Sequence, residues 1–433
     1  MVRVGVGLLG LGTVGGGVAR LLAGGAERIA RRTGCRLEVR RAAVRDLDKL
    51  RAVTLPAGRL VTDPRRVIDD PEVAIVVEAM GGTDPALPLV LAALAAGKDV
   101  VTANKALLAE HGREVFAAAR KHGRAVAFEG SVAGGIPIVQ ALGVALAANQ
   151  VQNLAAIVNG TCNFILTRMT GDGLPFDRAL AQAQELGYAE ADPTLDVDGT
   201  DTAHKLAILA QLAFGANVTT ASIPRQGIDR LQLADIRYAA ELGYAVKLLA
   251  LARLSDAGLA LRVAPTLVKR GRPLAEVQGP YNAIRVVGDA VGDTLFYGRG
   301  AGAMPTASAV VADLIDVAVG RTALTFRALG LWSDEPGPPL ATADQVRSRY
   351  YLRFTIADRP GVLASLAHVL GLHGISIASV IQHDPGDDAP PDAPVPLVIM
   401  THVATEAGLF KALTQIDRLD VVRAPSVCLG VED

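Results

Sequence analysis

Residues 1–130 alternate between short apolar runs and segments whose apolar positions have helical spacing. Val2–Leu9 is an apolar run of strand length, and Val18, Leu21 and Leu22 follow it on one helix face. Similar strand-like runs occupy 37–44, 73–78, 99–102 and 125–128, with a helical segment at 85–96. Strands that alternate with helices predict an open, mostly parallel α/β sheet.

The pattern changes after about Ala147, where longer strands and helices predict a second, α+β domain. The run of proline and glycine at 334–339 reads as a linker, and the lone Trp332 is expected to anchor it. The elements expected beyond it are strand 351–356, turn 358–361, helix 362–371, strand 375–382, a proline-rich insertion Asp384–Pro396, strand 397–401, helix 407–413 and strand 426–431. This order predicts a small βαββαβ unit.

A glycine-rich turn, GLGTVG at 10–15, joins the first strand to the first helix. In this arrangement Gly10 permits the tight turn, Gly12 lets the backbone approach a pyrophosphate, and Gly15 lets the helix pack close to the strand. The amide groups of the helix N-terminus then face the phosphates. The sequence therefore predicts a dinucleotide site at Gly10, Gly12, Thr13, Val14 and Gly15.

Charges at the end of the second predicted strand bear on the choice of cofactor. An acid near this point binds a free ribose 2′-hydroxyl, whereas a cation binds a 2′-phosphate. Arg45 comes first here, then Asp46, with Lys49 close behind. The same three charges also suit an ordinary surface loop. We expect NADP(H) as the preferred cofactor, with Arg45 in its site and NAD(H) as the alternative.

Composition narrows the class of protein. A chain of 433 residues should hold two or three domains, and a formal net charge of −1 argues against a nucleic-acid partner. The apolar stretch at the start is too short and too rich in glycine to span a membrane or to serve as a signal peptide. The cysteines lack metal or disulfide spacing, which leads us to expect the reducing cytoplasm. They are Cys35, Cys162 and Cys428.

The segment Gly187–Lys205 combines a cluster of acids with a lysine that enters an apolar run. The acids are Glu190, Asp192, Asp196, Asp198 and Asp201. Asp201 and Lys205 are four residues apart, so a helix places them on one face, with the acid on the favourable N-terminal side. One interpretation is a solvated loop with a weak surface ion pair. The other is a polar substrate pocket with a lysine placed for proton transfer.

Three further segments favour the pocket. VVTANK ends with Lys105 at the carboxyl end of a predicted parallel strand, where open α/β sheets bind ligands. NGTCNF at 159–164 is a polar turn between apolar segments, and FEGSVAGGIP at 128–137 is a glycine-rich bend with one carboxylate.

The sequence gives weaker support to two other chemistries, a cysteine nucleophile and a calcium site. A nucleophilic Cys162 would indicate a phosphorylating aldehyde dehydrogenase, but the residues around it lack the pattern of that class. The run from Thr194 to Gly199 imitates a calcium loop, yet threonine replaces the first acid and Lys205 stands where a bidentate glutamate is required. The histidines have no metal spacing and are interpreted as structural; they include His111, His122 and His204.

Six segments resemble the homoserine dehydrogenase family over nearly the whole chain. They are GLGTVG at 10–15, TANK at 102–105, FEGSVAGGIP at 128–137, NGTCNFIL at 159–166, GYAEADPTLDVDGTDTAHK at 187–205 and RGAGAMPTASAV at 299–310. The tail from Tyr351 is similar to an ACT domain, a regulatory module that binds amino acids, on the basis of DRPGVL at 358–363 and HGISIASVIQ at 373–382.

The resemblance implies an NAD(P)-dependent enzyme that reduces L-aspartate 4-semialdehyde to L-homoserine, in threonine, methionine and isoleucine biosynthesis. A partly desolvated lysine can protonate the developing alkoxide, and Lys205 is the first candidate for this acid/base. Lys105 would polarise the carbonyl, and Gly302 would return to the cofactor. The expected substrate-binding residues are Glu190, Asp196, Asp201, Gly160 and Thr161.

The resemblance also implies a monovalent cation, Na⁺ or K⁺, at the bend after Glu129. Its ligands would be Glu129, Val132, Gly134 and Ile136, and the alternative is a turn without an ion. Threonine is the expected ACT effector. A homodimer or homotetramer is expected, and the length of 433 residues leads us to expect the monofunctional form of the enzyme.

The expected architecture is α/β, with a Rossmann-type dinucleotide-binding domain at 1–147 that is completed by about 300–333. An α+β catalytic and dimerisation domain at 148–300, a linker at 334–349 and an ACT domain at 350–433 follow. A competing hypothesis is a catalytically silent amino-acid sensor. Both lysines and the acid cluster argue against it, because a sensor does not need them.

Overall fold

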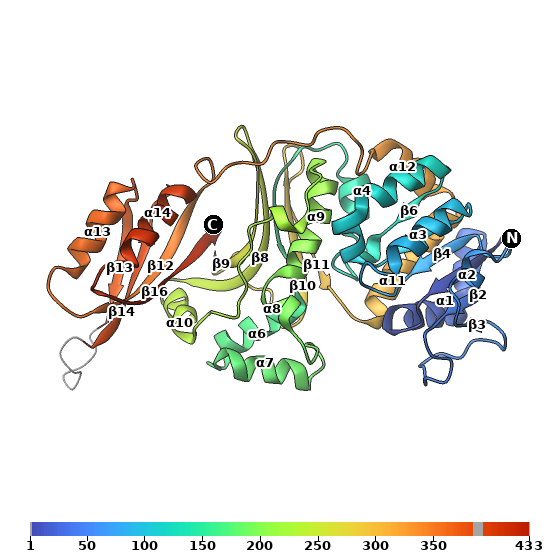
Figure 1. Cartoon of the computed structure of the whole chain (residues 1–433), viewed down its shortest axis with the longest axis horizontal. Coiled ribbons are helices and arrows are strands. Elements are labelled where there is room, and N and C mark those ends of the chain that lie inside the picture. Colours follow the sequence, from blue (N-terminus) through green and yellow to red (C-terminus); the bar gives the residue numbers. More distant parts are fainter. Residues whose placement is uncertain (1, 384–392, 433) are drawn as a thin grey trace. The chain divides into compact units, whose positions relative to one another are not determined.

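The computed structural model of the chain describes residues 2–383 and 393–432, without the side chains of 326–328. The chain divides into two compact units. Figure 1 labels the helices and strands of both. The first comprises 1–160, 200–224 and 280–338, and the second comprises 161–199, 225–279 and 339–433. The domain boundaries expected near 147, 300 and 334 stay predictions.

A six-stranded parallel sheet is the centre of the first unit, in the order β3-β2-β1-β4-β5-β6. Its strands are β1 (Val2–Leu9), β2 (Cys35–Ala43), β3 (Leu60–Val61), β4 (Ile75–Glu78), β5 (Asp99–Thr102) and β6 (Val126–Ala127), with helices α1 (Thr13–Thr33), α2 (Arg65–Ile68), α3 (Ala86–Ala95) and α4 (Lys105–His122). The strand order reverses beside β1, which is where such sheets bind ligands. The predicted Rossmann-type sheet is confirmed.

Burial explains why these strands read as unbroken apolar runs. Val6, Leu8 and Leu9 of β1 and all of β4 are buried, because helices cover both faces of a parallel sheet. Helix α11 (Ala303–Ala318) comes from much later in the chain and lies beside α1 (Figure 1). Its Val310 and Leu314 share one core with Val18 of α1.

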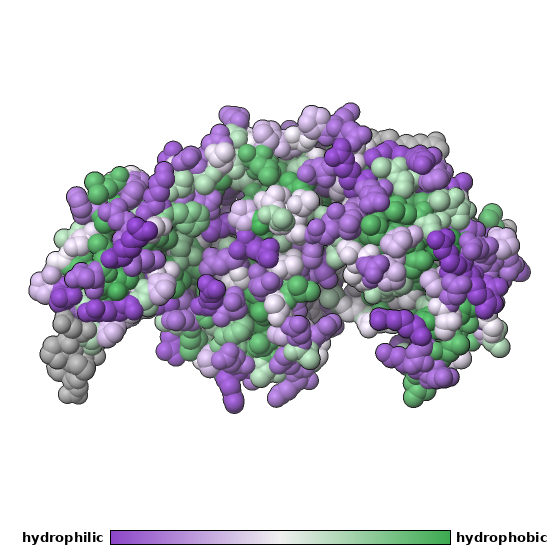
Figure 2. All heavy atoms as spheres, viewed as in Figure 1, coloured by the Kyte–Doolittle hydropathy of each residue, from purple (hydrophilic) through white to green (hydrophobic). Residues whose placement is uncertain are grey.

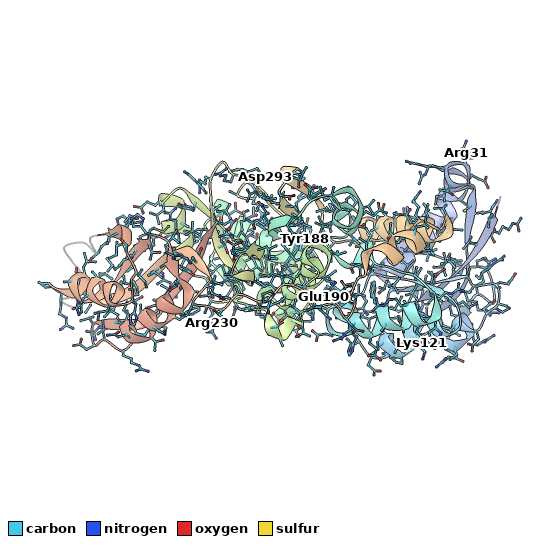
Figure 3. The ribbon with its side chains drawn as sticks, turned by 90° about the horizontal axis from the view of Figure 1, so that it is seen from above. Arg31, Lys121, Tyr188, Glu190, Arg230 and Asp293 are labelled. Carbon is cyan, nitrogen blue, oxygen red and sulfur yellow. The ribbon has the colours of Figure 1, made fainter. Side chains whose placement is uncertain are left out.

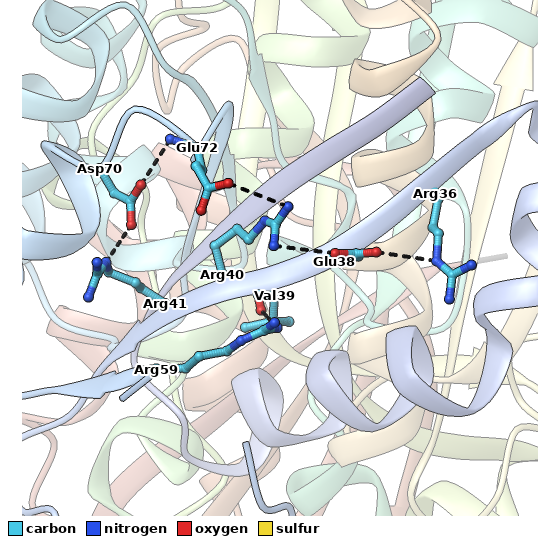
Figure 4. Close-up of polar contacts among 8 residues, drawn as sticks. All are labelled: Arg36, Glu38, Val39, Arg40, Arg41, Arg59, Asp70 and Glu72. Atoms are coloured by element: carbon cyan, nitrogen blue, oxygen red, sulfur yellow. Dashed lines mark hydrogen bonds and ion pairs between the residues drawn. The ribbon is translucent and has the colours of Figure 1, made fainter. Parts of the chain in front are cut away.

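The polar face of β2 carries alternating charges (Figure 4). Glu38 lies between two guanidinium groups, 3.3 Å from Arg36 Nε and 3.5 Å from Arg40 Nη1. Asp70 accepts hydrogen bonds from the side chain of Arg41 and from the amide of Glu72. Burial alone would raise the pKa of Asp70, but these hydrogen bonds and the Arg41 charge hold it below its usual value. They join β2 to the turn that precedes β4.

The rest of the first unit includes an antiparallel set of strands in the order β11-β10-β7. The elements are η1 (Glu129–Ser131), α5 (Ile138–Gln140), η2 (Ala141–Ala145), β7 (Val151–Ile157), α9 (Thr200–Phe214), η3 (Thr220–Ser222), β10 (Tyr281–Gly288), β11 (Gly292–Arg299) and α12 (Arg321–Leu329). Helix α9 packs against α4, which brings two helices from distant parts of the sequence together.

The second unit contains a sheet in the order β8-β9-β16-β12-β14-β13. Its first elements are α6 (Gly160–Gly171), α7 (Phe176–Glu185), α8 (Thr194–Val197), α10 (Leu233–Glu241), β8 (Tyr244–Ser255) and β9 (Gly258–Lys269). The last are β12 (Arg347–Ala357), α13 (Val362–Leu372), β13 (Ile377–Gln382), β14 (Pro394–Thr401), β15 (Ala404–Thr405), α14 (Glu406–Ile416) and β16 (Val422–Glu432). The predicted βαββαβ unit is confirmed, and β16 also pairs in parallel with β9.

Several predicted boundaries in this unit differ from the structure. Strand β12 begins at Arg347, within the expected linker, and β16 begins at Val422, four residues before the expected strand. The proline-rich insertion was expected to reach Pro396, but β14 already begins at Pro394. Both prolines pair with β12, and the pairing of β13 with β14 ends at Gln382 opposite Leu397. Since β13 does not continue beside these prolines, their missing amide hydrogens cost no bond to that strand. Residues 384–392 of the insertion lie outside the described residues.

Hydrophilic and hydrophobic residues are mixed over the face of the molecule that Figure 2 presents. Among the residues that the structure describes, no helix has both the length and the apolar character that crossing a bilayer requires.

Trp332 anchors the start of the expected linker within the first unit. It is 4% exposed, and its ring centroid lies 4.5 Å from that of Phe116 and 5.7 Å from that of Phe128. Gly112 of α4 lies directly beneath the indole, because a Cβ there would come within 2.5 Å of Nε1 and 2.6 Å of Cε2 of Trp332.

We expect Gly112→Ala to destabilise the protein by about 1–3 kcal/mol, because the new methyl group overlaps the indole. Gly24→Ala is the matched control: Gly24 is an exposed glycine inside α1, and a Cβ there would meet nothing within 4 Å. In Gly24→Ala the gain in helix propensity should stabilise the protein by roughly 0.5–1 kcal/mol. Urea unfolding of both variants measures the difference. Equal stabilisation by the two substitutions would contradict the assigned packing.

Candidate functional site

The glycine turn after β1 has two glycines that the fold itself requires and one that it does not. Gly10 has φ of 99°, and a Cβ there would lie 2.8 Å from the carbonyl oxygen of Ala79. A Cβ on Gly15 would lie 2.1 Å from the carbonyl oxygen of Gly10. Gly12 is exposed, and a Cβ there would meet nothing within 4 Å. Open space at Gly12 is what a bound pyrophosphate needs.

Gly302 comes close to this turn through the packing of α11 on α1. A Cβ on Gly17 of α1 would lie 2.7 Å from the carbonyl oxygen of Ala303, so the two helix starts are in direct contact. Gly302 precedes α11 with φ of 119°, a conformation that favours glycine. Thr13 and Val14 are the first two residues of α1.

The loop after β2 leaves Arg45 exposed. Asp46 stabilises the loop itself, since its Oδ1 accepts a hydrogen bond of 2.8 Å from the amide of Asp48. Arg51 donates to the carbonyl oxygens of Asp46 and Lys49, the latter at 2.6 Å. One carboxylate oxygen of Asp46 is therefore used by the loop backbone. Arg45, Asp46, Asp48 and Lys49 are all exposed, so both signs of charge are available after β2.

Asp201 lies between two lysines. Its Oδ2 is 2.6 Å from Lys205 Nζ, and its Oδ1 is 3.0 Å from Lys105 Nζ. The amide group of Asn159 donates a further hydrogen bond of 2.8 Å to Oδ2. Lys205 Nζ also donates to the carbonyl oxygen of Val158 at 2.6 Å. The structure thus brings both predicted lysines together around one carboxylate.

Burial and charge set the properties of this centre. Asp201 is 5% exposed, and the side chains of Lys205 and Lys105 are 11% and 42% exposed. Burial alone would raise the pKa of Asp201, but the charges of Lys205 and Lys105 and their hydrogen bonds hold it well below its usual value. Two ammonium groups around one carboxylate leave a net positive charge, which suits a developing alkoxide.

Local structure explains the position of Lys105. Asn104 caps α4 by accepting a hydrogen bond of 3.1 Å from the amide of Leu107, and its side-chain amide donates to the carbonyl oxygen of Gly82 at 2.6 Å. The buried carboxylate of Glu78, at the end of β4, accepts a hydrogen bond of 2.7 Å from Thr102. These contacts hold the carboxyl ends of β4 and β5 together.

Glu78, Asn104 and Asn159 were not among the predicted site residues. Glu78 is the last residue of β4, and the two asparagines lie two residues beyond the ends of β5 and β7; this was the signal available in the sequence. The predicted structural His204 points to α4, where its Nε2 lies 3.6 Å from Glu110 Oε1.

The other predicted substrate residues are divided between the units. Gly160 closes the first segment of the first unit, and a Cβ there would lie 2.8 Å from the carbonyl oxygen of Pro280. Thr161, Glu190 and Asp196 belong to the second unit. Thr161 donates to the carbonyl oxygen of Tyr188 at 2.7 Å. Tyr188 and Glu190, both labelled in Figure 3, follow α7 and precede α8 in the sequence, and Glu190 is exposed.

The bend after Glu129 is buried and rich in carbonyl groups. The Glu129 carboxylate accepts hydrogen bonds from the amides of Val139 at 2.8 Å and Gln140 at 2.9 Å, and its own amide donates to Asp313. Burial raises the pKa of Glu129, and burial together with the Glu129 charge raises that of Asp313 well above its usual value. Two buried carboxyl groups, those of Glu129 and Asp313, therefore lie together at this bend.

That turn contains the other predicted ligands. Val132, Gly134 and Ile136 are buried, and Gly134 has φ of 37°. A Cβ on Gly134 would lie 2.7 Å from the carbonyl oxygen of Gly300, so the bend packs against the segment before α11.

Asp201→Asn should cost about 3–5 kcal/mol at pH 7, because it leaves two ammonium groups without their carboxylate. The depressed pKa of Asp201 stabilises the fold above the unfolded value of about 4. The difference between wild type and variant should therefore shrink as the pH falls below about 4. Unfolding free energies between pH 3 and 8 measure it.

Asp256→Asn is the control, since Asp256 is exposed in the turn between β8 and β9 and should change stability by no more than about 0.5 kcal/mol. A loss for Asp201→Asn that stays constant down to pH 3 would disprove the electrostatic explanation.

Three family models match successive parts of the chain. The NAD-binding domain of homoserine dehydrogenase matches residues 10–129, homoserine dehydrogenase matches 137–315, and the ACT domain matches 350–421.

Known proteins match over the full length of the chain or over most of it. Homoserine dehydrogenase of Neisseria gonorrhoeae is 45% identical over 100% of this chain and 99% of its own length. The crystal structure of a homoserine dehydrogenase from Thiobacillus denitrificans is 48% identical, with a TM-score of 0.92 over 100% of this chain and 98% of that one. A hyperthermophilic archaeal homoserine dehydrogenase in complex with NADPH is 26% identical, with a TM-score of 0.61 over 73% of this chain and 98% of that one.

The glycine turn, the centre of two lysines and one aspartate, and these full-length matches lead to one conclusion: the chain belongs to the homoserine dehydrogenase family of nicotinamide-dependent oxidoreductases.

Proposed function

We propose that this enzyme reduces L-aspartate 4-semialdehyde to L-homoserine with Lys205 as the acid/base and Lys105 as the group that polarises the carbonyl. The main support for this proposal is that both lysines contact the buried carboxylate of Asp201. Nζ of Lys205 lies 2.6 Å and Nζ of Lys105 lies 3.0 Å from its oxygens. Lys105 begins α4 directly after β5, so the pair lies at the carboxyl edge of the parallel sheet, as does the glycine turn after β1.

The nicotinamide, when bound, supplies the hydride to the carbonyl carbon. Negative charge then develops on the carbonyl oxygen, and the Lys105 ammonium, the more exposed of the two, stabilises it. Lys205 donates a proton from Nζ to this oxygen, which completes the alcohol. The Lys205 amine then regains a proton from solvent, while its contact of 2.6 Å with Asp201 keeps Nζ in place. Oxidation of homoserine uses the same groups in reverse.

The contacts of Asp201 support a positioning role. Both of its oxygens already accept from Lys205, Lys105 and Asn159. We assign to it the placement of the two lysines, and direct contact with the substrate ammonium stays a prediction. In that prediction Glu190 and Asp201 would receive the ammonium, with Asp196 near them, and Gly160 and Thr161 would meet the polar end of the substrate. The exposure of Glu190 and the close packing of Gly160 are compatible with these roles.

NADP(H) is the proposed cofactor, with NAD(H) as the alternative. Support comes from the exposed Arg45 at the end of β2 and from the archaeal relative in complex with NADPH. The bend with Glu129, Val132, Gly134 and Ile136 would hold Na⁺ or K⁺ through its oxygens. The ACT domain would bind threonine, and the enzyme would act in the cytoplasm as a homodimer or homotetramer.

Lys205→Ala should lower kcat for homoserine oxidation by about 10²–10⁴-fold, the usual contribution of a positioned acid/base. Lys105→Ala should also lower kcat/KM, because the charge that stabilises the alkoxide is lost. Lys121→Ala, at the exposed end of α4, is the control and should behave as wild type. Steady-state formation of the reduced nicotinamide measures all three. Unchanged turnover in Lys205→Ala would exclude it as the acid/base.

Arg45→Ala should raise KM for NADP⁺ about tenfold, since a charge-assisted hydrogen bond contributes roughly 1.5–3 kcal/mol. KM for NAD⁺ should stay within about twofold, because NAD⁺ lacks the 2′-phosphate. Arg31→Ala, in the last turn of α1, controls for the general loss of positive charge. Equal effects on both cofactors would argue against contact of Arg45 with the phosphate.

A further inference from the structure

A lysine of the second unit is buried against neutral oxygens. Lys247, in the middle of β8, is 4% exposed, although lysine is almost never fully buried. Its Nζ donates to the carbonyl oxygen of Val277 and to Asn163 Oδ1, the latter at 3.3 Å. Among the residues that the structure describes, no carboxylate lies within 4.0 Å of this ammonium.

This burial is unfavourable for the charge. It lowers the pKa of Lys247 to about 8, with Glu276 opposing the shift. An apolar side chain of similar length would avoid the desolvation cost, which is several kcal/mol for a buried ion. Core stability alone therefore does not explain why a lysine occupies this position. Its hydrogen bonds to neutral oxygens indicate its role.

Asn163 connects Lys247 to the start of α6. It is 1% exposed, and its side-chain amide donates to the carbonyl oxygens of Val277 at 3.2 Å and Gly279 at 2.9 Å. The amide of Gly279 donates to Thr167 on the next turn of α6 at 3.0 Å. Segment 277–279 and the first turns of α6 thus form one hydrogen-bonded network, with the Lys247 ammonium bonded to both.

We propose that Lys247 is a positioning residue for substrate binding. Through its hydrogen bonds to Asn163 and to the carbonyl oxygen of Val277, it holds the first turn of α6 in place, and with it Thr161. Thr161 lies two residues before Asn163 in this turn, so a shift of Asn163 moves Thr161 as well. The inference rests on the proposed contact of Gly160 and Thr161 with the polar end of the substrate. Lys247 itself touches neither substrate nor cofactor in this role.

The test is initial-rate kinetics of homoserine oxidation with Lys247→Met, Asn163→Ala and the double variant, together with their unfolding free energies. Lys247→Met should raise KM for homoserine about tenfold or more and leave KM for NADP⁺ within about twofold, because the cofactor residues belong to the other unit. The double variant should be no worse than the poorer single variant, because both substitutions break the same network.

Lys98→Met is the matched control. Lys98 also donates to two backbone carbonyl oxygens, those of Asp70 at 3.0 Å and Val73 at 2.6 Å, but it precedes β5 at the opposite end of the parallel strands from Lys105. This variant should lose stability and keep its KM for homoserine. A merely structural Lys247 would behave in the same way, and that result would overturn the proposal.

Two further variants keep the outcomes separate. Lys247→Gln retains a hydrogen-bond donor, and if neither it nor Lys247→Met folds, Lys247 is a stability residue and the proposal is wrong. Thr161→Val tests the underlying assignment: an unchanged KM for homoserine in this variant refutes direct contact by the Thr161 hydroxyl. If KM for homoserine is unchanged in Thr161→Val but raised in Lys247→Met, the positioning role of Lys247 stands, and it acts on the backbone of this turn instead of on the Thr161 hydroxyl.

Discussion

The buried carboxylate of Asp201 is the interaction on which the proposed chemistry depends. A carboxylate that is 5% exposed is costly unless cations and hydrogen-bond donors surround it. Lys205 comes from the next turn of the same helix, Lys105 from the start of α4, and Asn159 from the segment after β7. The fold must therefore place three separate segments together to satisfy one acid. The same arrangement leaves one positive charge in excess where an alkoxide would form.

The parallel sheet delivers these groups to one edge. Strand β1 leads into the glycine turn, and β5 leads into Asn104 and Lys105, so cofactor loop and lysine leave the sheet at its carboxyl end. The buried Glu78, bonded to Thr102, holds the intervening strand ends in place. Hydride donor and proton donor can meet only if this edge is rigid, because small displacements weaken both transfers. The hydrogen bonds within the sheet edge are consequently as much a part of the site as the lysines.

Much of this fold was predictable from apolar patterning. Strands β1 and β5 have the limits that the sequence indicated, since buried parallel strands are continuous apolar runs bounded by glycine or polar residues. The start of β14 was not predictable in this way, because prolines are uncommon in an inner strand. The two prolines are tolerated there because β13 ends before it reaches them.

Lys247 was missed for a related reason. A single lysine in an otherwise apolar strand looks like a solvent-facing position, and its burial depends on Asn163 and Val277 from elsewhere in the chain.

The sequence by itself determined the family, the cofactor turn and the pairing of Asp201 with Lys205, because a spacing of four on a helix is a local geometric constraint. It did not determine that Lys105 would meet the same carboxylate. Only the packing of α4 against α9 brings Lys105 to Asp201, and the same folding assigns Glu190 and Asp196 to the other unit. Long-range contacts of this kind follow from how helices pack, and no local pattern of residues records them.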